Sequence, residues 1–275
     1  MQWASILFLN LLGLAASAVA MDLVTYATDP QHEDLALLRR TASRWNGWSA
    51  LNVIGTQEGF DTHGLVDKLR ALRRFAKHRD PDSIIVFVDA YDVIINNEPF
   101  QLESVFLASG KRVLIASELG CCTDKETALA LRTECHRHWP FASAVGRQWL
   151  NSGVIIGYAR DIRRLLRLAW KEYLSHPAVY RAMTDQQLMC FLVSDGATIW
   201  TRESVGIDHL SEAALTTYQT DIVLDGAGPL SLDDKGRIVF DNRTVPAIIH
   251  FNGPKSQKAA QMRYARAHFP LVKGP

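Results

Sequence analysis

Short runs rich in apolar residues alternate along this sequence with longer segments of helical periodicity, and this alternation restricts the possible folds more than any other feature. The clearest run covers residues 84–88 (IIVFV), which is wholly apolar, as expected of a parallel strand covered on both faces. Similar runs and the amphipathic segments near them lie at 23–28, 50–54, 65–76, 113–116, 153–156 and 161–175. The sequence therefore predicts an α/β fold with a Rossmann-type, mostly parallel central sheet flanked by helices.

The length and the composition fit a single domain. The 275 residues are 48% hydrophobic and 21% charged, which is enough to bury one large core. A segment rich in Gly and Asp at 225–236 predicts turns and a hairpin before a last apolar run at 247–250. Because 30 Lys and Arg face 29 Asp and Glu, the net charge of +1 creates no field that would gather a polyanion. Nucleic acid is therefore not an expected partner.

The first twenty residues differ from the rest of the chain. They contain an apolar stretch that ends in the small residues Ala18-Val19-Ala20, as a signal peptidase site does. An uncleaved membrane anchor is the alternative, but Asn10 and Gly13 interrupt the stretch, and it is short for a bilayer core of about 30 Å. We predict a signal peptide at 1–20, a mature domain at 21–275 without a membrane span, and a location in the secretory pathway, in the endoplasmic reticulum or Golgi lumen, or outside the cell.

The cysteines and one glycosylation sequon bear on this prediction. The chain contains Cys121, Cys122, Cys135 and Cys190, which allow three full pairings in an oxidising lumen. Because adjacent cysteines rarely pair with each other, we expect one bridge to Cys135. A zinc site is the alternative, but no Cys-x-x-Cys or paired His spacing supports it. The sequon at 242–244 (NRT) predicts a glycoprotein if the chain enters the lumen.

Two carboxylates follow the most apolar run directly. Asp89 and Asp92 lie three residues apart at the carboxyl end of the predicted strand, where α/β sheets bind their ligands. Two hard oxygen donors held this close suit a divalent cation, and a diphosphate could complete its coordination. The alternative is structural, since Asp often ends a strand through turn hydrogen bonds.

A second polar cluster follows the last apolar run and favours the metal site. His250 offers an imidazole ligand, Asn252 and Gly253 offer side-chain and backbone donors, and Lys255 can neutralise a phosphate. Alone, a histidine such as His250 would more often be a buried core residue with satisfied hydrogen bonds. Together, the two clusters outline a site for a metal ion and a diphosphate.

The motifs in this order resemble the glycosyltransferase domain of procollagen lysyl hydroxylases and related collagen glycosyltransferases, which has a GT-A type fold. The resemblance covers about 23–270 and is carried by VTYAT at 24–28, FVDAYDV at 87–93, LNSG at 150–153 with GY at 157–158, and IHFNGP at 249–254. It implies a GT-A-like fold and transfer of a hexose from UDP-glucose or UDP-galactose to a hydroxyl acceptor, with retention of configuration. The acceptor would be a glycan or a hydroxylysine of a collagen-like protein.

The resemblance also implies roles for individual residues. Three would bind Mn(II), namely Asp89, Asp92 and His250. Contacts to the UDP-sugar would come from Thr25, Lys68, Tyr91, Asn252, Gly253 and Lys255, with Tyr91 against the uracil ring. Asn151 would border the donor sugar as a catalytic candidate, within a segment where Gly153 permits close approach of the backbone.

The acceptor side departs from the family pattern. The family has a run of acidic residues before a Gln, whereas this chain reads MTDQQ at 183–187 and keeps only Asp185 as a catalytic candidate. Thr184 and Gln187 also form a capping box, so Asp185 could simply complement a helix dipole. Asp208 and His209 are a weaker candidate pair. A non-catalytic protein that binds UDP-sugars or glycans is therefore the alternative function, and a hydrolase of nucleotide sugars is a third.

Overall fold

The computed structural model describes residues 21–56, 64–120, 141, 147–176, 184–194, 197–218, 230–241 and 244–269. The predicted signal peptide, Cys121, Cys122, Cys135 and the first two residues of the sequon lie outside these ranges, so those predictions stand as they were made. Cys190 lies inside them and is buried. Among the described residues, no helix has the length and apolar character needed to cross a membrane.

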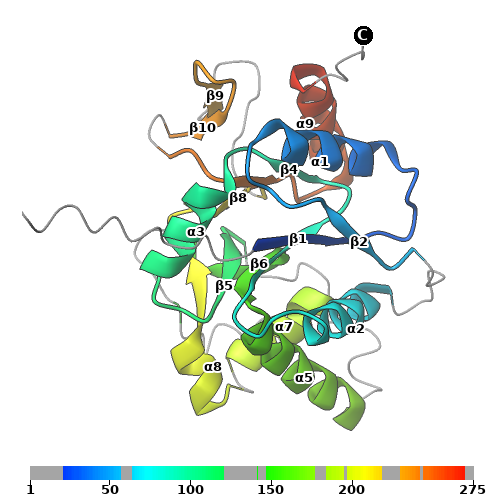
Figure 1. Cartoon of the computed structure of the whole chain (residues 1–275), viewed down its shortest axis with the longest axis vertical. Coiled ribbons are helices and arrows are strands. Elements are labelled where there is room, and N and C mark those ends of the chain that lie inside the picture. The colour runs from blue at the N-terminus through cyan, green and yellow to red at the C-terminus, as the bar shows by residue number, and fades with distance from the viewer. Residues whose placement is uncertain are drawn as a thin grey trace, which may run out of the picture.

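Nine of the described strands form one curled sheet at the centre of the protein (Figure 1). They are β1 (Met21–Tyr26), β2 (Asn52–Ile54), β3 (Ile84–Asp89), β4 (Val93–Ile95), β5 (Val113–Glu118), β6 (Trp149–Tyr158), β7 (Val205–Asp208), β8 (Ala214–Thr216) and β11 (Ile248–His250). Their order is β2-β1-β3-β6-β5-β8-β11-β4, and β7 also pairs with β5. Most neighbouring strands are parallel, which confirms the predicted α/β sheet.

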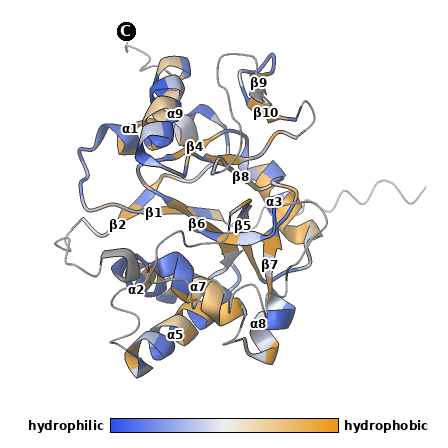
Figure 2. Cartoon of the chain, turned by 180° about the vertical axis from the view of Figure 1, so that it is seen from behind, coloured by the Kyte–Doolittle hydropathy of each residue, from blue (hydrophilic) through white to orange (hydrophobic). Residues whose placement is uncertain are grey.

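Helices cover both faces of this sheet. They are α1 (Glu33–Arg44), α2 (Gly64–Lys77), α3 (Pro99–Ala108), α5 (Ala159–Ser175), α7 (Asp185–Val193), α8 (Ile199–Ser204) and α9 (Lys255–His268). In Figure 1, α1 and α9 lie above the sheet, and α2, α5 and α7 lie below it. Figure 2 shows hydrophobic and hydrophilic residues side by side along α5, as expected of a helix with one buried face.

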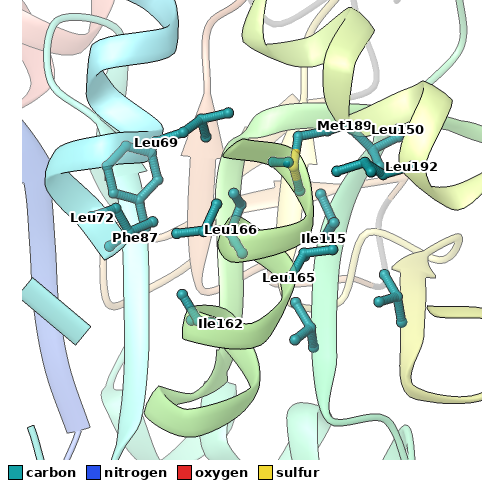
Figure 3. Close-up of a cluster of buried hydrophobic side chains, with 14 of the residues drawn as sticks. Leu69, Leu72, Phe87, Ile115, Leu150, Ile162, Leu165, Leu166, Met189 and Leu192 are labelled. Atoms are coloured by element: carbon teal, nitrogen blue, oxygen red, sulfur yellow. The ribbon is translucent and has the colours of Figure 1, made fainter. Parts of the chain in front are cut away.

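The lower layer packs on the sheet through a continuous apolar core, part of which Figure 3 shows. Leu69 and Leu72 from α2, and Ile162, Leu165 and Leu166 from α5, are at most 3% exposed. They contact side chains of β3 and β5 within the same buried cluster. At about 25 cal/mol per Å² of apolar surface, burying each such leucine or isoleucine contributes roughly 1.5–3 kcal/mol, so this core fixes α2 and α5 against the sheet.

One strand departs from the simple parallel pattern. The run at 153–156 forms the middle of β6, which is antiparallel to both β3 and β5. As a result, β6 begins at the edge where β3, β5 and β11 end. Sequence analysis missed β4, β7 and β8, which are short and carry little pattern of their own. The predicted hairpin is present as β9 (Leu230–Leu232) paired antiparallel with β10 (Ile238–Phe240).

Candidate metal and donor site

The predicted metal ligands meet at the edge where the parallel strands end. Asp89 is the last residue of β3, His250 is the last residue of β11, and Asp92 lies just after β3. Each of the three side chains offers one ligand atom, and these three atoms lie within 4.8 Å of one another. His250 Nε2 is 3.4 Å from Asp92 Oδ2 and 3.7 Å from Asp89 Oδ2. Two carboxylates and an imidazole in this arrangement could hold a divalent cation.

The charges in this cluster depend strongly on one another. Burial raises the pKa of the Asp92 carboxyl, but His250 and Lys258 outweigh this effect and hold the pKa well below its usual range. Burial lowers the pKa of the His250 ring, whereas the neighbouring Asp92 and Asp89 raise it above its usual value. The two carboxylates therefore stabilise a proton on the ring. A metal ion would replace that proton, so metal affinity should fall as the pH falls.

Gly153 gives His250 the space that it occupies. Gly153 precedes Val154, which pairs with Val88 of β3, and an added Cβ at Gly153 would lie 2.2 Å from His250 Cε1 and 2.9 Å from Asp89 Oδ2. The group that lies close to this glycine is therefore the imidazole ring of the cluster itself. The predicted approach of the backbone to the donor sugar stays a prediction.

Lys68 connects the metal cluster to the acceptor-side helix. Its Nζ lies 2.9 Å from Asp89 Oδ1 and 2.7 Å from Asp185 Oδ2, and the side chain is buried. Burial lowers the pKa of this ammonium, but Asp185 and Asp89 together raise it above its usual value. Lys68 thus stays charged inside the protein, and α2 contributes this buried side chain to the site.

Asp185 begins a capped helix and turns its side chain toward the metal cluster. Thr184 and Gln187 form the expected capping box at the start of α7. Asp185 is the first helical residue, yet its carboxylate turns inward, where it binds Lys68 and accepts a 2.5 Å hydrogen bond from Ser152 Oγ. The capping box is therefore confirmed, and the catalytic role of Asp185 stays a prediction. The Asp185 carboxylate is engaged by two partners, Lys68 and Ser152.

Sequence analysis missed a buried carboxylate in the same site, Glu118 at the end of β5. Its carboxylate accepts hydrogen bonds from the side-chain amides of Asn151, Asn252 and Gln186. Burial raises the pKa of Glu118 to about 7, although the hydrogen bonds from Asn151 and Gln186 oppose the rise. The signal that identified Asp89 applied here as well, since Glu118 also ends an apolar run at the carboxyl edge of the sheet.

The predicted nucleotide contacts lie in several environments. Thr25 is fully buried, and its hydroxyl donates to the Val88 carbonyl within the sheet. The Tyr91 hydroxyl accepts a hydrogen bond from the Asp29 backbone amide, and the Tyr91 ring lies 4.4 Å from that of His32. The assigned contacts of Thr25 and Tyr91 to the nucleotide remain predictions.

The loop between β11 and α9 carries the remaining predicted contacts. Asn252 accepts backbone hydrogen bonds from residues 217 and 218 and donates to Glu118. Gly253 is exposed with a φ of 128°, a conformation that favours glycine. Lys255 is exposed at the first residue of α9, whereas Lys258 lies 2.6 Å from Asp92. Lys258 is therefore a second phosphate-binding candidate, which sequence analysis did not identify.

The weaker pair, Asp208 and His209, has structural contacts. Asp208 accepts backbone hydrogen bonds from residues 212, 213 and 214 and so holds the turn after β7. Burial raises its pKa to about 6 against the opposing effect of these bonds. His209 Nδ1 lies 2.9 Å from the carbonyl oxygen of Arg147.

Comparisons with known proteins identify the family and the fold. Residues 18–265 match the family described as the PLOD GT domain. The human multifunctional procollagen lysine hydroxylase and glycosyltransferase LH3 is 28% identical over 233 residues, which cover 82% of this chain and 27% of the relative. The Caenorhabditis elegans multifunctional procollagen lysine hydroxylase and glycosyltransferase is 27% identical over 219 residues, 74% of this chain and 27% of the relative. The chain thus spans about a quarter of the length of these relatives.

Solved structures of glycosyltransferases share the fold. The galactosyltransferase LgtC, in complex with donor and acceptor sugar analogues, superposes with a TM-score of 0.52 at 13% identity, covering 93% of this chain and 98% of LgtC. A glycosyltransferase involved in glycosylation of the major capsid of PBCV-1 superposes with a TM-score of 0.52 at 10% identity, covering 90% of this chain and 99% of that one. These similarities show a GT-A glycosyltransferase fold.

Proposed function

The chain belongs to the family of the PLOD glycosyltransferase domain, and from this premise we propose that it transfers a hexose from a UDP-sugar to a hydroxyl acceptor with the help of Mn(II). UDP-glucose and UDP-galactose are the donors in question. The acceptor is a hydroxylysine-linked glycan or a hydroxylysine of a collagen-like protein. The proposal includes the signal peptide at 1–20, a single domain at 21–275 and activity in the lumen of the secretory pathway.

The observation that carries the proposal is the cluster of Asp89, Asp92 and His250 at the carboxyl edge of the sheet. Its fit to a hard divalent cation rests on the donor set, two carboxylates with one imidazole whose ligand atoms lie within 4.8 Å of one another. When bound there, Mn(II) would supply positive charge to the diphosphate of the donor. The cluster therefore supports binding of the UDP moiety at this end of the sheet.

The residues around the cluster would bind and orient the two substrates. Lys258 and Lys255 would neutralise the diphosphate as negative charge develops on the leaving oxygen, which is an electrostatic stabilisation of the transition state. Lys68 holds Asp89 and Asp185 in fixed positions through two ion pairs. In the reaction the acceptor hydroxyl oxygen bonds to the anomeric carbon, and the bond from that carbon to the β-phosphate oxygen breaks. UDP leaves with the electron pair, and the hydroxyl proton passes to UDP or to solvent.

The acceptor side favours one alternative, a protein that binds UDP-sugars without transferring them. Asp185 is the only carboxylate of its short segment, and it is buried in contact with Lys68 and Ser152. Two glutamines follow it. A carboxylate engaged in this way is a weak nucleophile, so retention of configuration would not proceed through a covalent bond to Asp185.

The experiment that separates the two functions measures UDP release by the purified chain. UDP-sugars are supplied one at a time, with Mn(II) or a chelator, and with or without a galactosyl-hydroxylysine peptide. We expect metal-dependent release that the acceptor stimulates. Tight binding of UDP without release under any condition would establish the non-catalytic alternative, and release of free sugar faster than transfer would indicate a hydrolase.

A pair of variants tests the assigned ligands. Asp89→Ala removes one carboxylate of the cluster and is expected to abolish Mn(II)-dependent binding of UDP. Asp82→Ala is the matched control, because Asp82 is an exposed aspartate that pairs with Arg160 at the surface. Calorimetric titration with UDP, in Mn(II) or in chelator, measures both. Retention of metal-dependent affinity in Asp89→Ala would exclude this set of ligands.

A further inference from the structure

Amide side chains from three elements converge on one buried carboxylate. Glu118 Oε2 accepts hydrogen bonds from Asn151 Nδ2 at 2.8 Å and from Asn252 Nδ2 at 2.7 Å. Its other oxygen, Oε1, accepts from Gln186 Nε2 at 2.6 Å. Asn151 lies on β6, Asn252 follows β11, and Gln186 lies in the first turn of α7. Glu118 thus connects three of the segments that form the site.

Backbone amides fix the orientation of both asparagine side chains. Asn151 Oδ1 accepts from the backbone N–H of Gly153 at 2.9 Å. Asn252 Oδ1 accepts from the backbone N–H groups of residues 217 and 218 at 2.8 and 3.0 Å. A backbone N–H can only donate, so in each side chain the atom that it contacts must be the oxygen. The amide nitrogens of both asparagines must then point at Glu118.

The orientation of Asn151 determines the protonation of His250. His250 Nδ1 lies 3.0 Å from Asn151 Oδ1, and an amide oxygen can only accept a hydrogen bond. Nδ1 therefore carries a hydrogen. When the ring is neutral, the lone pair is on Nε2, the nitrogen that faces Asp89 and Asp92. Hydrogen bonds of this kind commonly set the tautomer and orientation of a metal-binding histidine.

We infer that Glu118 is a positioning residue for the metal centre, which acts through Asn151 to hold His250 with Nε2 directed at the metal ion. The inference rests on the proposed function. Without Glu118, the Asn151 side chain keeps its bond to Gly153 but loses the partner of its amide nitrogen. The ring of His250 is then held less firmly, and part of its population turns away from the two aspartates.

The test measures Mn(II) affinity in the presence of UDP, by the electron paramagnetic resonance signal of free Mn(II), in the full chain. Loss of a hydrogen-bond partner of a metal ligand usually weakens metal binding about 10–100-fold. Asn151 is that partner of His250, and Glu118 holds Asn151, so we expect Glu118→Ala to weaken Mn(II) binding by up to this factor. Glu118→Gln is expected to retain most of the affinity, because its amide oxygen can still accept from both asparagines, and only the bond from Gln186 is lost. Asp161→Ala is the matched control, since Asp161 is a buried carboxylate that pairs with Arg112 away from the site.

A second variant covers the case in which Glu118→Ala does not fold. Asn151→Ala removes the same connection while Glu118 stays in place, and it is expected to weaken Mn(II) binding to a similar degree. In the double variant the two losses should not add. Wild-type affinity in either folded single variant would overturn the inference and leave the proposed function intact. Absence of Mn(II) binding in the wild-type chain would overturn the proposed function together with this inference.

Discussion

The substitution Gly153→Ala tests the metal centre with the smallest possible change. The added Cβ would lie 2.2 Å from His250 Cε1 and 2.6 Å from Nδ1, well inside ordinary van der Waals contact. The φ of Gly153 is not positive, so the effect is steric and involves no backbone strain. The imidazole ring would have to retreat by roughly 1 Å, whereas metal–ligand distances vary by only about 0.2 Å.

The expected magnitudes follow from this conflict. Overpacking a buried site costs about 1–3 kcal/mol of unfolding free energy. Displacement of one of three ligands should weaken Mn(II) binding at least tenfold, or about 1.4 kcal/mol. The ring has little room to adjust, because His250 is only 3% exposed and its Nδ1 is hydrogen-bonded to Asn151.

Gly157→Ala is the matched control on the same strand. Its added Cβ would lie 2.8 Å from the carbonyl oxygen of Arg112 and 3.2 Å from Ile162 Cγ1, so a comparable steric conflict arises away from the metal ligands. Thermal unfolding should show a loss of stability in both variants. Calorimetry with Mn(II) and UDP should show a loss of affinity in Gly153→Ala alone. Equal affinities in the two variants would refute the reasoning.

Further predictions concern buried charge and pH. Lys68→Met should lower the free energy of unfolding, measured in urea, by about 3–5 kcal/mol, because it leaves two carboxylates without their cation. This loss should shrink at acid pH. The control Lys77→Met, at an exposed position, should change the free energy of unfolding little. Burial raises the pKa of Asp208 to about 6, so the folded state binds the proton more tightly than the unfolded state does. The protonated carboxyl group therefore stabilises the folded state at pH values below its ordinary pKa, and this contribution is lost as the pH rises to about 6. The stability difference between the wild type and Asp208→Asn should therefore fall by about 1–3 kcal/mol between pH 4 and pH 6, and a constant difference would contradict the assignment. Lys258→Ala should weaken UDP binding about tenfold, and more than Lys255→Ala does, because Lys258 contacts Asp92 of the metal cluster. Equal affinities of the two variants for UDP, measured by calorimetry, would argue against this ranking.

The site could be predicted in part because its central ligands carry a local signal. Asp89 and His250 each follow a strongly apolar run. Open α/β sheets bind ligands at the carboxyl ends of their parallel strands, so both residues could be placed at that edge without knowledge of the tertiary structure. Glu118 obeys the same rule at the end of β5, but a single glutamate has no neighbouring motif that would distinguish it from a surface residue. Lys258 lacks even that signal, since it lies one turn into a polar helix.

The sequence by itself determined the α/β class, the main strands and helices, and the residues at the ends of two of those strands. These features depend on apolar periodicity and turn chemistry, which act between residues close along the chain. The direction of β6, the bridge from Lys68 to two carboxylates, and the three amides around Glu118 were decided only by the tertiary structure. Each depends on contacts between residues 21 to 134 positions apart, and no local pattern records which distant groups will share a buried charge or a hydrogen bond.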